Sequence, residues 1–83
     1  MDYLPFRVVI TDKQSVLFDQ QVWALTSQNA AGEFDILAEH VSFVTHITGP
    51  IKLLMPDKSE KSFTAKAGFI HVHEQVAKIY ISE

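Results

Sequence analysis

Glu33, Asp35, His40 and Ser42 are the residues of this chain whose types and spacing could support chemistry. Glu33 and Asp35 lie two residues apart on a predicted strand, so their side chains share a face at a separation of about 7 Å. Carboxylates so spaced could serve as the acid and base of a glycoside hydrolase. A solvated strand face has the same pattern, and without an aromatic sugar platform nearby it is the favoured interpretation.

Asp35, His40 and Ser42 also contain the groups of a hydrolytic triad. A serine nucleophile needs a base within hydrogen-bond reach and oxyanion donors, and the Gly-x-Ser-x-Gly turn that supplies them in many hydrolases is missing. With only three glycines, the chain has no glycine-rich phosphate loop either. We therefore expect no catalytic residue, no small-molecule substrate and no cofactor, and a small hydrolase is the weakest of the interpretations.

His71 and His73 are the other pair with possible chemistry, because a His-x-His pair on one strand face could hold two corners of a zinc or copper site. The remaining ligands would have to come from His40, His46 or a carboxylate, and nothing in the spacing demands this. Two histidines on a wet strand face are favoured, and no metal is expected. Trp23 is most simply a residue of the core or its rim.

The elements that must position these residues are all strands, because apolar residues alternate with a period of two and never at helical spacing. We expect strands at 6–10, 15–18, 22–26, 33–37, 41–47, 51–55, 61–66, 69–73 and 76–81. A loop is expected at 27–32, turns at 49–50 and 56–58, and the clearest hairpin turn at 74–75. The spacing indicates a sandwich or barrel, with residues 1–83 as a single domain.

Composition excludes several function classes. The 83 residues carry a net charge of −3 and no cysteine, so the chain lacks a basic surface for nucleic acid and a thiol for catalysis or metal binding. Its apolar runs are far shorter than the ~20 residues of a membrane span. The first residues resemble neither a signal nor a transit peptide. A cytosolic or peripheral membrane protein is expected.

Three predicted strands are apolar on both faces, at 8–10, 16–18 and 53–55. A half-buried antiparallel strand should alternate instead. We expect part of this surface to contact another protein. Imperfect patterning is the alternative, because much ordinary protein surface is apolar.

Segment 32–45 has a specific residue pattern. It is Gly-Glu-Phe-x-Ile-Leu-x-x-His-x-x-x-x-Thr, from Gly32, Glu33, Phe34, Ile36, Leu37, His40 and Thr45, and Val41, Phe43 and Val44 agree in character. It resembles Gly-Glu-Phe-Gly-Ile-Leu-Pro-Gly-His-Ala-Pro-Leu-Leu-Thr of the epsilon subunit of F-type ATP synthases. Segments 17–22 and 67–72 are similar to that family's Val-Phe-x-Gly-x-Val and Ser-Gly-Gly-Phe-Leu-Glu-Val. The resemblance therefore covers nearly the whole chain, in order.

The departures from the family pattern cluster in and around the same segment. Asp35 replaces a Gly, Ala38 and Glu39 replace Pro-Gly, and Ser42 replaces a Pro; Gln20 and Ala67 replace glycines elsewhere. The loop before His40 thus loses a rigid proline and gains negative charge. The chain ends at Glu83, where relatives typically continue into two helices that carry an inhibitory arm. The resemblance implies coupling without that inhibition.

The resemblance implies an all-β fold, a flattened antiparallel β-sandwich of about ten short strands. It also implies a non-catalytic central-stalk subunit that links the gamma subunit to the c-ring of a proton- or sodium-translocating ATP synthase. Such a subunit is peripheral to the cytoplasmic face of a bacterial inner membrane, or to the stromal face in a plastid. The alternative is a stand-alone β-sandwich that binds a protein or a metal.

On this basis we expect the polar c-ring contact at Glu33, Asp35, Glu39 and His40, while the gamma-facing residues stay unassigned. The ring loops of relatives carry Arg and polar residues, which suit charge-assisted hydrogen bonds. An imidazole titrates near pH ~6.5, so His40 could make the contact sensitive to pH. The favoured alternative is that His40 caps a backbone carbonyl inside the loop.

Overall fold

The computed structural model describes residues 4–37 and 42–82, apart from the side chain of Phe43. These residues form one sheet with strand order β2-β1-β7-β6-β5-β3-β4. The strands are β1 (Phe6–Thr11), β2 (Val16–Val22), β3 (Ala24–Asn29), β4 (Gly32–Ile36), β5 (Phe43–Leu54), β6 (Glu60–His73) and β7 (Val76–Ser82). The expected all-β fold is therefore confirmed.

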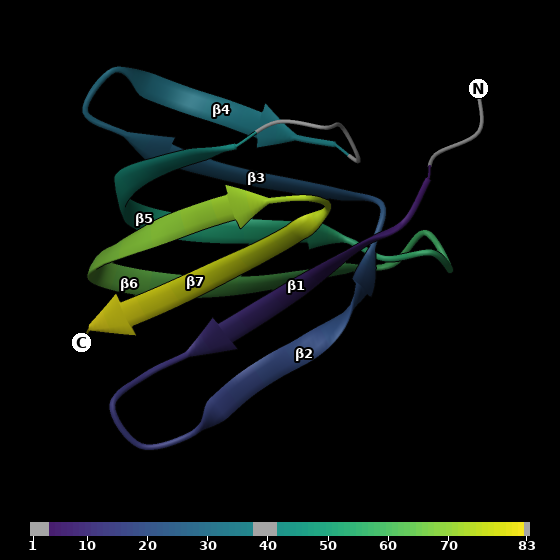
Figure 1. The fold of residues 1–83 in the computed structure, drawn as a ribbon, viewed down its shortest axis with the longest axis horizontal. Helices are drawn as coiled ribbons and strands as arrows, with labels where there is room; N and C mark the ends of the chain where they lie inside the picture. The colour runs from purple at the N-terminus through teal and green to yellow at the C-terminus, as the bar shows by residue number, and fades with distance from the viewer. Residues whose placement is uncertain (1–3, 38–41, 83) are drawn as a thin grey trace.

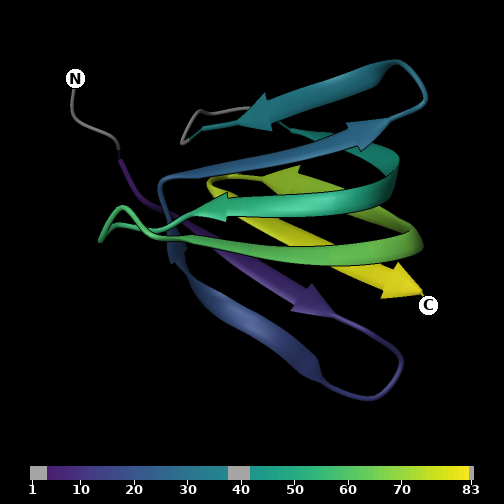
Figure 2. The same cartoon turned by 180° about the vertical axis from the view of Figure 1, so that it is seen from behind.

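The sheet folds over on itself because its two longest strands bend. The β5–β6 ladder shifts register between Ile47 and Gly49, and Gly49 has a φ of 83°, which glycine adopts without steric cost. Figures 1 and 2 show β5 and β6 curving round one end of the molecule. One layer thus contains β2, β1, β7 and the adjoining halves of β6 and β5. The other contains β4, β3 and the remaining halves of β5 and β6.

The strand count is lower than the expected ten, because neighbouring predicted strands are continuous. Gly49 and Pro50 lie inside β5 at its bend, and β6 runs through the interval between the predicted strands 61–66 and 69–73. The expected loop at 27–32 is also shorter. Ser27 is buried in β3, where its hydroxyl donates to the Pro50 carbonyl at 3.3 Å, so the turn is confined to residues 30–31.

One strand pair departs from the expected antiparallel arrangement. β1 and β7 run parallel, with Val8 opposite Ala77 and Ile10 opposite Ile79, while the other pairs among the described strands are antiparallel. Parallel strands are not connected by a tight turn, so they can be far apart in the sequence. Here the first and the last of the described strands pair side by side.

The core lies between the two layers and takes alternate residues from each strand. It contains Phe6, Val8, Ile10, Phe18, Val22, Leu25, Ile36, Ile47, Ile51, Leu53, Met55, Ala65, Ile70, Val72, Ala77, Ile79 and Ile81. Trp23 is half-buried at its rim, and its backbone N–H donates to the Leu54 carbonyl at 2.7 Å. Among the described residues no helix is long and apolar enough to span a membrane.

The hairpin expected at 74–75 is present, with His73 opposite Val76. Glu74 and Gln75 have φ values of 48° and 67°. A two-residue turn with both φ values positive is the type I′ turn, whose twist matches that of the strands it joins. This turn fixes which β6 and β7 side chains face outward.

Candidate protein-interaction site

The two carboxylates singled out in the sequence lie on β4, at the edge of the sheet, and both are exposed. Asp35 is opposite Thr26 on β3, and the Thr26 hydroxyl donates to Asp35 Oδ1 at 2.6 Å. Glu33 is opposite Gln28 and is the second residue of β4. Glu33 and Asp35 are therefore exposed to solvent on a strand that pairs with β3 in a defined register. Glu39 and His40 lie outside the described residues.

The turn before β4 holds Glu33 at one end of the sandwich. Asn29 Oδ1 accepts the backbone N–H of Ala31 at 2.9 Å, and Gly32 has a φ of 125°. The Asn29 side chain also donates to Thr45 Oγ1 at 3.2 Å, which ties the turn to β5. Glycine is the residue best suited to that φ, so Gly32 sets the direction in which β4 starts.

Asp35 and Ser42 do not join in a triad. Asp35 bonds to Thr26, whereas Ser42 Oγ lies 2.8 Å from His73 Nδ1, and His73 Nε2 lies 3.8 Å from Glu74 Oε1. The side chains of His73 and Glu74 are 61% and 81% exposed, so water competes for both. Sequence reasoning missed the Ser42–His73 contact, because it depends on the register that puts Phe43 opposite Val72.

His71 and His73 share the outer face of β6 as expected, with ring centroids 6.2 Å apart. Within residues 4–37 and 42–82, no group of three or more His, Asp or Glu side chains is arranged to hold a metal ion. The arrangement of these histidines with their neighbours therefore has the chemistry of a polar contact surface.

The two outer faces of the sandwich differ in chemistry. On the face over β4, β3 and β5, one cross-strand row contains Asp35, Thr26, Lys52 and Ser62, with both charged residues exposed. Glu33 lies on the same outward side of β4 as Asp35. This polar face suits a hydrated contact of the kind found at the rims of protein interfaces.

The opposite outer face, over β1, β7, β6 and the first residues of β5, carries exposed apolar side chains, and we call it the aromatic face. It consists of Arg7, Val9, Val44, Phe69, His71, His73, Val76, Lys78 and Tyr80. Phe69 is 44% exposed and Val44 64% exposed. The alternation in β6 explains this, because Ile70 and Val72 point into the core. Of the three segments expected to be apolar on both faces, only 8–10 contributes to this face, through Val9, whereas Val16 and Leu17 are exposed on β2.

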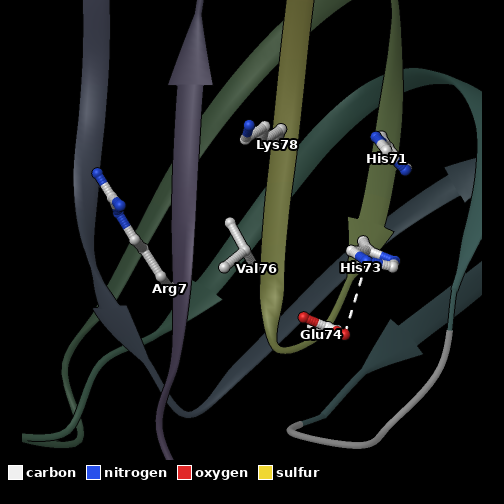
Figure 3. A pocket seen from close by; sticks show the side chains of 6 residues that line it. All are labelled: Arg7, His71, His73, Glu74, Val76 and Lys78. Atoms are coloured by element: carbon white, nitrogen blue, oxygen red, sulfur yellow. Dashed lines mark ion pairs between the residues drawn. The ribbon is translucent and has the colours of Figure 1, made fainter.

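A shallow hollow of about 330 Å³ lies on the aromatic face beside the β6–β7 turn. Figure 3 shows its lining side chains projecting from β1, β6, β7 and the β6–β7 turn: Arg7, His71, His73, Glu74, Val76 and Lys78. Arg7 is committed to Asp19, with Nε and Nη2 each donating to a carboxylate oxygen at 2.8 Å. That bond and the charge of Asp19 raise the pKa of Arg7, so it stays ionised.

Comparison with protein families identifies the same kind of domain along nearly the whole chain. Residues 5–83 match the model of the family described as ATP synthase, Delta/Epsilon chain, beta-sandwich domain. An ATP synthase epsilon chain of Sulfurovum is 30% identical over 70 residues, which are 83% of this chain and 55% of that protein. One from Chlorobium limicola is 29% identical, over 81% of this chain and 77% of that protein. The chain thus spans little more than half of the Sulfurovum relative.

Solved structures share the fold. A chain in the Euglena gracilis mitochondrial ATP synthase (OSCP/F1/c-ring) superposes with a TM-score of 0.88 at 22% identity, covering 95% of this chain and 51% of that one. A chain in the central stalk/c-ring structure of the Tetrahymena thermophila enzyme gives 0.77 at 14% identity, covering 100% and 67%. At these identities the likeness supports the fold alone.

Proposed function

Because the chain belongs to the ATP synthase delta/epsilon chain β-sandwich family, we propose that it is a non-catalytic central-stalk subunit of a proton- or sodium-translocating ATP synthase. It links the gamma subunit to the c-ring, so that ion-driven rotation of the ring reaches the catalytic head. The observation that carries this proposal is the family match over residues 5–83, with epsilon chains among the curated relatives. The solved structures that share the fold are of ATP synthase assemblies that contain a c-ring.

The chemistry of the surface supports a connector. A connector needs two contact surfaces and no reacting group, and the described residues offer one polar and one apolar outer face. Its position is peripheral to the membrane, at the cytoplasmic face in a bacterium or the stromal face in a plastid.

The ring contact is proposed at Glu33, Asp35, Glu39 and His40. Glu33 and Asp35 are exposed on an edge strand, and Glu33 follows the turn at one end of the sandwich. Carboxylates there can accept charge-assisted hydrogen bonds from arginine or polar side chains of ring loops. Asp35 already accepts a bond from Thr26, which leaves Glu33 as the more available of the two.

Charge reversal tests this contact. Glu33→Lys should reduce recovery of c-ring subunits with the tagged chain, with an unchanged melting temperature, because Glu33 is exposed. Glu60→Lys is the matched control, since Glu60 is an exposed acid at the far end of the β5–β6 ladder, opposite Leu54. Equal ring recovery with both variants would remove Glu33 from the contact.

A further inference from the structure

The outer end of β3 is attached to β5 by side chains and not by the backbone ladder. The ladder between these two strands begins at Ala24, and its last pair is Thr26 opposite Lys52. Beyond that pair β5 bends, where its register with β6 shifts between Ile47 and Gly49. The last residues of β3 and the turn that follows them therefore need another attachment to the rest of the sheet.

Three consecutive polar side chains supply that attachment. The hydroxyl of Ser27 donates to a β5 backbone carbonyl at 3.3 Å. The side chain of Gln28 packs so closely on Gly49 that a Cβ there would stand 2.9 Å from the Gln28 amide nitrogen. Asn29 Nδ2 donates to Thr45 Oγ1 at 3.2 Å. Asn29 is the last residue of β3, so its bond is the attachment nearest to the β3–β4 turn.

The backbone of the β3–β4 turn does little to fix its own direction. The two-residue turns that match the twist of a hairpin have positive φ at one or both central positions, and turns without it splay the strands. Neither Ala30 nor Ala31 has a positive φ, which is found only at the following Gly32. Asn29 opposes the splaying twice, because its Oδ1 accepts the Ala31 N–H at 2.9 Å while its Nδ2 bonds to Thr45.

The direction of this turn determines where the Glu33 carboxylate stands. Glu33 is exposed and is the second residue of β4. No described residue bonds to its carboxylate, whereas Asp35 is fixed by the Thr26 hydroxyl at 2.6 Å. A side chain without a partner is placed by its backbone alone. The position of Glu33 therefore depends on how the start of β4 is held.

We propose that Asn29 is a positioning residue for the ring contact. Through its bonds to Ala31 and Thr45 it holds the start of β4 against β5, and so keeps the Glu33 carboxylate where a hydrogen-bond donor of the ring can reach it. Such preorganisation strengthens binding, because less conformational freedom is lost when the contact forms. The role rests on the proposed function, which supplies the ring as the partner of Glu33.

The test is titration of the full-length tagged chain against purified c-ring and, separately, against purified gamma subunit. Asn29→Ala removes both bonds, and Thr45→Val removes the acceptor on β5 while keeping the shape of the side chain. Each should weaken ring binding about fivefold, the effect of losing one hydrogen bond, and leave gamma binding unchanged. Thr45→Ser keeps the hydroxyl and should bind the ring like the wild type. If Asn29→Ala does not fold, as its melting temperature would show, the two Thr45 variants provide the test.

Two controls separate positioning from a general loss of stability. Asp57→Ala removes a similar turn contact, since Asp57 Oδ1 accepts the Ser59 N–H at 2.9 Å. That turn, between β5 and β6, lies at the opposite end of the molecule (Figures 1 and 2), so ring binding should not change. In a Glu33→Gln background, Asn29→Ala should weaken ring binding no further, because Asn29 acts through Glu33 and the two effects do not add.

The outcomes separate this role from the proposed function. If the wild-type chain does not bind the ring, the proposed function fails and the role of Asn29 fails with it. If the wild type binds the ring and the folded Asn29→Ala and Thr45→Val variants bind it equally well, the role is overturned while the function stands. A loss that Thr45→Ser shares, or that adds to the loss from Glu33→Gln, overturns the role in the same way.

Discussion

Gly68 lies where two strands come unusually close. A Cβ on Gly68 would stand 2.4 Å from the Tyr80 carbonyl oxygen and 3.2 Å from Ile81 Cα, both backbone atoms of β7. These atoms cannot move without separating β6 from β7. The glycine is therefore required by space, and the resemblance pattern that includes Gly68-Phe69 has a physical reason.

We predict that Gly68→Ala destabilises the protein by about 1–3 kcal/mol, the usual cost of overpacking. The methyl group would meet the β7 backbone and force the ladder apart. Urea denaturation followed by circular dichroism measures the change. Ala67→Ser, at the exposed position beside it, should alter stability little; a Gly68→Ala variant as stable as the wild type would show that the strands lie farther apart.

Residue roles at the candidate site could be predicted only where they depend on local pattern. Exposure of Glu33 and Asp35 followed from alternation along one strand. The contact between Ser42 and His73 could not be predicted, because it depends on pairing between distant strands. The hydrogen bond between Thr26 and Asp35 could not be predicted either. A loop was expected at 27–32, so the pairing of β3 with β4 that places these two residues opposite each other was not foreseen.

At the scale of elements, the β6–β7 hairpin is held by an unfavourable turn sequence. Type I′ turns favour Asn-Gly, yet Glu74 and Gln75 occupy the two positive-φ positions here. An L-residue in this region costs about 1–2 kcal/mol. The ladder from His73–Val76 to Ala67–Ser82 evidently offsets that cost.

We predict that Gln75→Gly stabilises the protein by about 1 kcal/mol, because glycine has no Cβ strain at positive φ. The backbone carbonyl of Gln75, which accepts the Arg7 N–H at 3.1 Å, is retained. Thermal unfolding measures the gain. Gln21→Gly, in the extended strand β2, should instead lose about 0.5–1 kcal/mol; a loss at both positions would contradict the turn assignment.

Strand positions were predictable from period-two alternation, and strand continuity was not. Gly49-Pro50 indicates a turn when met in a sequence, but here the positive φ of Gly49 bends a single strand. Pro50 is exposed there. Whether such a pair ends a strand or bends it depends on the β6 partner across the ladder.

At the scale of the whole molecule, stability should depend on acid pH. Backbone N–H groups of Gln14 and Ser15 lower the pKa of Asp12, the Arg7 guanidinium lowers that of Asp19, and the Ser59 hydroxyl and N–H lower that of Asp57. A carboxyl with a lowered pKa in the folded state stabilises that state above its unfolded pKa of about 3.9. That contribution disappears as the pH falls through the folded pKa.

We predict that the free energy of unfolding is steady between about pH 7 and 5 and falls below about pH 4. Urea titrations across this range measure it. The triple variant Asp12→Asn, Asp19→Asn and Asp57→Asn should show a smaller fall, since amides do not titrate. A wild-type protein whose stability is constant or rises below pH 4 would contradict the native roles of these carboxylates.

At the same scale, the fold of the described residues and their two outer faces support the proposed function, a joint between partners that rotate together. The most direct measurement is purification of the tagged chain from gently solubilised membranes of its own organism, followed by identification of the accompanying proteins by mass spectrometry. We predict that gamma and c-ring subunits accompany it in constant proportion. Recovery of the chain alone, or with companions from outside the ATP synthase, would contradict that function.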